Sequence, residues 1–135
     1  MTDRSVPSAA AIFLASAIAA AGMVAHNVLE FGPAFLLRPE TVIPLAIFGL
    51  LALLGWARPA NSVIHVLLLG WAVLNLVGGG ILSVLPLGLF PFQPEQSLGH
   101  YAIHVIYAVA QLPLVVVAAG GLSRRGRRGV VEDTR

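Results

Sequence analysis

The stretch Ala9–Leu29, AAAIFLASAIAAAGMVAHNVL, contains no Asp, Glu, Lys or Arg. As an α-helix rising about 1.5 Å per residue, it would be about 31 Å long, which matches a bilayer hydrocarbon core of about 30 Å. Ser8, directly after Pro7, is a typical residue for capping the start of such a helix. The stretch therefore predicts a helix that crosses a membrane.

Three further apolar runs, at about residues 41–57, 63–85 and 99–122, have the same character. The chain is 58% hydrophobic and 10% charged, whereas soluble domains carry about 25% charged residues. We therefore expect an all-α integral membrane bundle of four antiparallel transmembrane helices over residues 1–123, a multi-pass protein of the plasma membrane with lipid as its main surroundings. Alternatively, the first run is a signal peptide cleaved near Ala19–Ala21, which would leave three spans.

The arginines predict the orientation of the bundle, because cytoplasmic segments carry an excess of basic residues. Arg4, Arg58 and the arginines of the tail fall on one side of the predicted spans, and Arg38 falls alone on the other. This distribution places both termini in the cytoplasm. Residues 124–135 are expected to form a disordered tail. Its arginines are expected to hold the last span at anionic lipid headgroups and not to bind nucleic acid; they are Arg124, Arg125, Arg127 and Arg128.

Ionisable groups inside a membrane are costly, so those within the spans point to a site. Four polar residues of the last run recur at steps of four, three and four and form one stripe: His100, His104, Tyr107 and Gln111. On the first run, His26 and Glu30 are four residues apart and share a face. Both pairs lie near the non-cytoplasmic ends of their helices, so His26, Glu30, His100 and His104 can converge if these helices are neighbours.

The sequence leaves several readings of this cluster open. Three imidazoles and a carboxylate can bind a metal ion such as zinc, iron or copper. His26 and His104 could instead ligate a b-type haem across the bundle, and the same groups could relay protons or hold a quinone-like ligand. The structural alternative is a mutually hydrogen-bonded cap with Glu30 neutralised by a protonated imidazole.

Two functions follow from these readings. The first is a non-enzymatic accessory or interaction subunit that packs on a membrane protein partner, or on a second copy, through small residues such as Ala11, Ala15 and Ala19. The second is a metal- or haem-binding component in redox chemistry or transport. No set of nucleophile, base and acid suggests an enzyme, and the absence of Cys excludes thiolate sites.

Three polar or flexible features lie outside this cluster. His65 falls near the opposite membrane face and is expected to form an interfacial hydrogen bond. Asn75 lies near mid-membrane, where Gln111 is its expected partner. The run Gly78–Gly80 predicts a loosened or bent helix.

Overall fold

The regular elements are all helices in the computed structural model, which describes residues 6–87 and 95–132, with side chains described as far as residue 123. Its elements are α1 (Ala9–Phe31), the 3₁₀ helix η1 (Pro33–Leu37), α2 (Pro39–Ala57), α3 (Ser62–Val73), the π-helix η2 (Leu74–Ile81), the 3₁₀ helix η3 (Leu82–Val84) and α4 (Leu98–Glu132).

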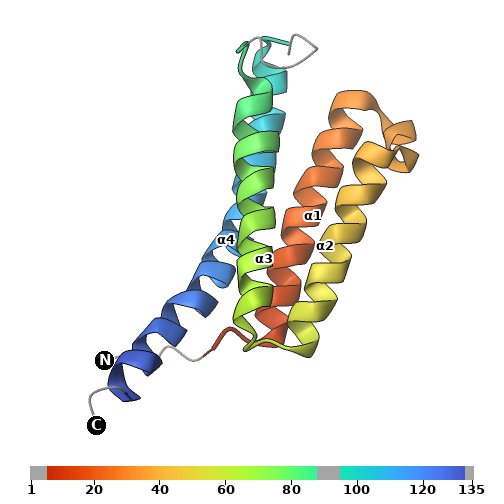
Figure 1. The fold of residues 1–135 in the computed structure, drawn as a ribbon. Coiled ribbons are helices and arrows are strands. Elements are labelled where there is room, and N and C mark those ends of the chain that lie inside the picture. The colour runs from red at the N-terminus through yellow and green to blue at the C-terminus, as the bar shows by residue number, and fades with distance from the viewer. Residues whose placement is uncertain (1–5, 88–94, 133–135) are drawn as a thin grey trace.

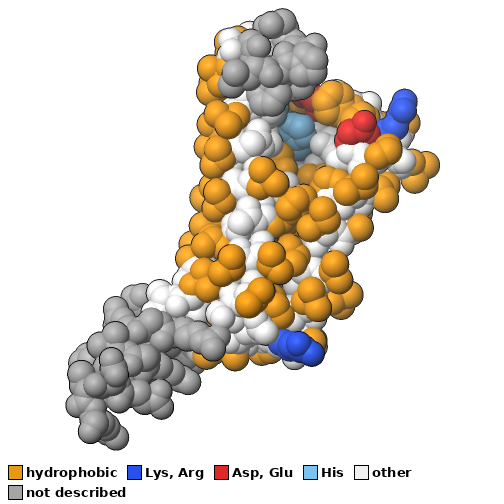
Figure 2. Space-filling view, in the orientation of Figure 1, with side chains coloured by type: hydrophobic (Ala, Val, Ile, Leu, Met, Phe, Trp, Pro, Cys, Tyr) orange, Lys and Arg blue, Asp and Glu red, His pale blue; other side chains and the backbone are white. Residues whose placement is uncertain are grey.

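Four helical stretches are long and apolar enough to cross a bilayer: Ala9–Phe31, Pro39–Ala57, Ser62–Val84 and Leu98–Ser123. This confirms the predicted all-α class with four such helices and indicates a membrane protein. Apolar side chains cover most of the face seen in Figure 2, as expected where lipid is the solvent.

The helix boundaries follow from local capping. The Ser8 hydroxyl accepts a hydrogen bond from the Ala11 amide at 3.1 Å, and the Asn61 carboxamide oxygen accepts from the Val63 amide at 2.9 Å. These side chains satisfy backbone donors that the first turn leaves free. Gly32 ends α1 with φ of 84°, a conformation that a residue with a Cβ rarely adopts.

The helices form a bundle whose two ends differ (Figure 1). The upper end in this view holds the end of α1, η1, and the starts of α2 and α4, and the lower end holds the start of α1 and the end of α4. α1 packs extensively against α2 and α4, and α3 packs against α4. Because α2 and α3 make few contacts with each other, the bundle has an open side between them.

The packed core is apolar in the lower half of the bundle. Ile12, Leu68, Leu114 and Ala118 are all buried there. At mid-height a Cβ added to Gly22 of α1 would overlap the Ala110 side chain of α4. This glycine therefore allows the close approach of α1 and α4 that brings their polar residues together.

The expected loosening at Gly78–Gly80 coincides with the change from α3 to the π-helix η2. At the other end of the chain, the backbone of α4 remains helical through Glu132. The side chains of Arg124, Arg125, Arg127 and Arg128 lie outside the described part of the structure, so their role as a membrane anchor and the expected disorder of the tail stay predictions.

Candidate functional site

The structure brings together the polar residues of α1 and α4 at the upper end of the bundle. The Nε2 atoms of His26 and His104 lie 3.1 Å apart. His100 Nδ1 lies 2.7 Å from Glu30 Oε1, and the rings of His100 and His104 have centroids 4.5 Å apart. We call these four residues the His–Glu site. The two helices are neighbours, which the sequence left as an assumption.

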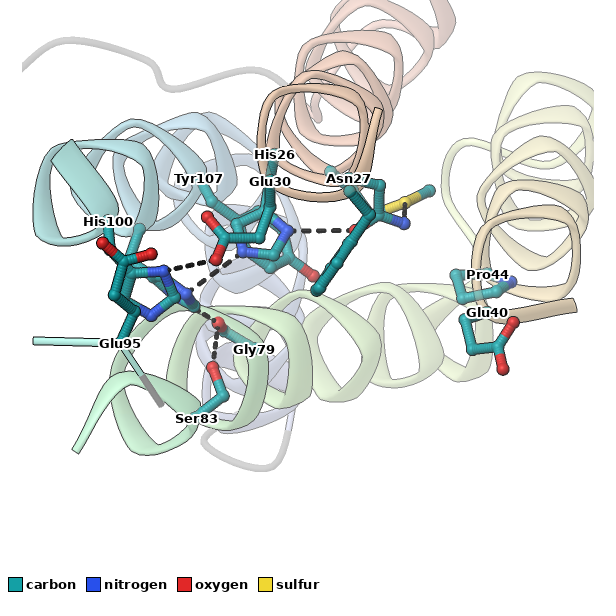
Figure 3. A pocket seen from close by; sticks show the side chains of 13 residues that line it. His26, Asn27, Glu30, Glu40, Pro44, Gly79, Ser83, Glu95, His100 and Tyr107 are labelled. Atoms are coloured by element: carbon teal, nitrogen blue, oxygen red, sulfur yellow. Dashed lines mark hydrogen bonds and ion pairs between the residues drawn. The ribbon is translucent and has the colours of Figure 1, made fainter. Parts of the chain in front are cut away.

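Each of the three imidazoles has its Nδ1 atom beside an oxygen. Nδ1 of His26 lies 3.0 Å from the Asn27 carboxamide oxygen, and Nδ1 of His104 lies 3.0 Å from the carbonyl oxygen of Gly79. His100 Nδ1 faces the Glu30 carboxylate (Figure 3). Carbonyl and carboxylate oxygens only accept hydrogen bonds, so all three Nδ1 atoms are assigned as donors.

This assignment leaves the Nε2 atoms with their lone pairs. A neutral imidazole that carries its proton on Nδ1 has a bare Nε2. The Nε2 atoms of His26 and His104 therefore present two lone pairs to each other at 3.1 Å, which is repulsive unless a proton or another cation lies between them. His100 Nε2 is buried and has no partner among the described residues. The site thus has the electronic character of a cation receptor.

The ring orientations depend on neighbours that the sequence reading did not single out. Asn27 donates through Nδ2 to Thr41 Oγ1 at 2.7 Å, which turns its oxygen toward His26. The carbonyl oxygen of Gly79 accepts from both His104 Nδ1 and the Ser83 hydroxyl. Asn27 is visible in the sequence as a polar neighbour of His26 and Glu30, but no sequence pattern reveals which carbonyl oxygen a histidine will meet.

Gly79 is required where it stands because η2 packs tightly on α4. A Cβ at this position would lie 2.6 Å from Tyr107 Cε1 and 2.8 Å from its hydroxyl oxygen. π-helical turns expose carbonyls and are frequent at functional sites. The glycine therefore allows η2 to present its carbonyl oxygen to His104.

The predicted polar stripe on α4 continues below the His–Glu site. The Tyr107 hydroxyl donates to Asn75 Oδ1 at 2.6 Å, and Asn75 Nδ2 donates to the Trp71 carbonyl oxygen. Gln111 donates to the carbonyl oxygen of Ala19 at 3.1 Å. The expected pair of Asn75 with Gln111 is therefore wrong, because Tyr107 occupies the asparagine oxygen.

His65 lies at the lower end, apart from the His–Glu site. Its Nε2 is 2.8 Å from the Pro59 carbonyl oxygen, and its ring occupies the space that a Cβ at Gly121 would need. This contact ties the turn between α2 and α3 to α4. His65 is therefore a packing and turn residue.

A cavity of about 580 Å³ adjoins the His–Glu site. Its lining comes from α1, α2, η2, η3, α4 and the residue Glu95 before α4. The lining residues are Met23, His26, Asn27, Glu30, Phe31, Glu40, Pro44, Gly79, Ser83, Glu95, His100, His104 and Tyr107. Figure 2 shows an imidazole and carboxylates around a hollow near the upper end. The volume is typical of a small-ligand pocket.

The polar interior does not extend through the bundle. Below Gln111 most of the described core is apolar, as at Leu68 and Leu114, and its buried polar residues Ser16 and His65 do not line the cavity. Within the described chain, no group of three His, Asp or Glu side chains is arranged to hold a metal ion as the side chains stand. Comparisons of the chain with protein-family models, curated proteins and solved structures give no match.

Proposed function

We propose that the chain is an antiparallel four-span protein of the plasma membrane with both termini in the cytoplasm. The arginines support this orientation, because Arg58 and the tail fall at the lower end and Arg38 alone falls at the upper end. The His–Glu site then lies near the non-cytoplasmic face.

The function that the geometry supports best is non-enzymatic binding of a transition-metal cation, as a component of metal transport or redox chemistry. One observation carries the proposal: the Nδ1 atom of each of the three imidazoles lies beside an oxygen that only accepts, which leaves the three Nε2 lone pairs without a hydrogen-bond donor. Metal-binding histidines characteristically donate their second nitrogen to a carboxylate or carbonyl in this way. In this assignment Glu30 orients His100 and is not itself a metal ligand.

The distance between the imidazoles fits a small ion better than haem. Two nitrogens bound to one tetrahedral zinc lie about 3.3 Å apart, given Zn–N distances of about 2.0–2.1 Å, and the Nε2 atoms of His26 and His104 lie 3.1 Å apart. Two axial ligands of haem iron would lie about 4 Å apart with the porphyrin between them. The tight contact of Gly22 with Ala110 supports the small ion, because it keeps α1 and α4 too close for a porphyrin.

Binding would complete the site by a side-chain movement. His26 and His104 would hold the metal ion through their Nε2 atoms, and His100 would join them by turning its free Nε2 toward it. Three imidazoles suit zinc, copper, iron or nickel, and they leave a further position for water or a second ligand. His100 has room to turn because it lines the cavity.

An interaction role through the small residues of α1 has less support. Ala15 and Ala19 are 3% and 0% exposed, because they pack inside the bundle. This face is therefore occupied by the chain's own helices and is not free for a partner helix. An accessory role through another surface stays a prediction.

Metal titration of the protein in nanodiscs of zwitterionic lipid tests the proposal. We expect one equivalent of Zn²⁺ or Co²⁺ to bind, with Co²⁺ giving visible absorption bands of a low-coordinate site. His26→Ala and His104→Ala should each weaken binding by at least about 100-fold, since even loss of a residue that only orients a metal-binding histidine costs about 10–100-fold.

His65→Ala is the matched control, because it removes a histidine at the opposite end and should leave the affinity unchanged. Wild-type protein that binds neither ion, or equal affinities in the wild type and both site variants, would rule the proposal out. A Soret band that appears on addition of haem and is lost in His104→Ala would show that the site binds haem and not a metal ion.

A further inference from the structure

The cavity wall offers many hydrogen-bond acceptors and few free donors. The Ser83 hydroxyl donates to the Gly79 carbonyl oxygen, the Tyr107 hydroxyl donates to Asn75, and Asn27 donates to Thr41. The imidazole Nδ1–H groups are also used. The polar groups that remain available in this mainly apolar cavity are therefore acceptors, which suit positive charge or hydrogen-bond donors.

Two carboxylates of the cavity have no assigned role in the His–Glu site. Glu40 in the first turn of α2 and Glu95 before α4 are exposed and line the cavity. Neither side chain forms an ion pair or hydrogen bond within the described part of the chain. In Figure 3 Glu95 lies on the side of His100, and Glu40 lies across the cavity on α2.

A second observation concerns the imidazole of His100, which lines the same cavity. His100 is 8% exposed, lines the cavity, and has a buried Nε2 atom with no partner among the described residues. The volume of about 580 Å³ is far more than a bare ion needs. A cation with six waters, at about 30 Å³ per water, occupies about 180 Å³ and fits within this volume.

We infer that Glu40 and Glu95 form an electrostatic mouth that captures hydrated divalent transition-metal cations from the aqueous phase and delivers them to the three imidazoles. This inference rests on the proposed function, because it assigns the capture step to that same site. Rim charges act mainly on association rates and on their salt dependence. A purely structural role of Glu40 at the start of α2 would change stability and leave the association rate unchanged.

Stopped-flow binding of Co²⁺ to the protein in zwitterionic nanodiscs tests the inference. Glu40→Gln and Glu95→Gln should each slow association about threefold at low salt, and the double variant about tenfold, since each charge acts through water. The dissociation rate should not change. In 0.5 M salt the association rates of the wild type and the variants should differ by no more than about twofold.

Glu132→Gln is the control. It removes one negative charge, as Glu40→Gln and Glu95→Gln each do, but at the far end of α4, and should leave the association rate unchanged. Equal association rates for the wild type and the double variant would overturn the inference, as would an effect confined to the dissociation rate. If both proteins bind Co²⁺ tightly and at equal association rates, the inference about Glu40 and Glu95 fails and the proposed function stands. If the wild type binds no Co²⁺ at equilibrium, the inference and the proposed function both fail.

Discussion

At the scale of single residues, Asn27 holds His26 in the orientation that leaves Nε2 free. Its oxygen accepts from His26 Nδ1 while its nitrogen donates to Thr41. We expect Asn27→Ala to weaken Co²⁺ binding by about 10–100-fold, because His26 loses the partner that fixes its tautomer and ring plane. Equilibrium titration measures this effect, and Asn27→Asp should restore much of the affinity by keeping an acceptor.

The other buried asparagine is the control for this prediction. Asn75 is 7% exposed and bonds to Tyr107 and Trp71, not to an imidazole. Asn75→Ala should cost about 1–3 kcal/mol of stability through the unsatisfied Tyr107 hydroxyl and should change affinity much less. Equal losses of affinity in the two variants would mean that Asn27 acts only through general stability.

At the scale of elements, the contact between η2 and α4 depends on Gly79. An added Cβ would lie 2.6 Å from Tyr107 Cε1, so Gly79→Ala must displace the Tyr107 ring, whose hydroxyl donates to Asn75, or move η2 away from α4. We expect a loss of about 1–3 kcal/mol in the free energy of unfolding, together with weaker Co²⁺ binding. Denaturant unfolding in detergent micelles and metal titration give the two readouts.

The neighbouring glycine offers a close control for Gly79→Ala. A Cβ at Gly78 would meet only Leu74 Cδ1 at 3.8 Å, which is ordinary contact. Gly78→Ala should therefore be neutral, or stabilising by up to about 1 kcal/mol through helix propensity. If both alanine variants behave alike, the close packing of η2 on Tyr107 does not matter to the site.

At the scale of the whole molecule, the absence of cysteine makes the proposed orientation easy to test. Leu37→Cys places a thiol on an 87% exposed residue of the upper end, and Thr134→Cys places one in the tail. A membrane-impermeant maleimide should label the first variant in intact cells and the second only after lysis, because the basic tail favours the cytoplasm. Labelling of Thr134→Cys in intact cells would invert the orientation and move the His–Glu site to the cytoplasmic face.

The sequence by itself determined the four apolar helices and the depth of the histidines within them. Lipid offers no hydrogen bonds, so each span needs about 20 apolar residues, and this demand is visible in the runs themselves. The helical rise then places His26 on α1 and His104 on α4 at similar depths and keeps His65 at the other end, where it bonds to the Pro59 carbonyl oxygen.

Only the tertiary structure decided that α1 and α4 are neighbours and which ring nitrogens remain free. Helix order depends on close fits such as that of Gly22 with Ala110, which the apolar pattern does not encode, because several faces of each helix are apolar and can face either lipid or another helix. The free Nε2 atoms depend on where the Gly79 carbonyl oxygen and the Asn27 oxygen lie. Hydrogen bonds act over about 3 Å, so they are settled by packing in three dimensions and not by spacing along the chain.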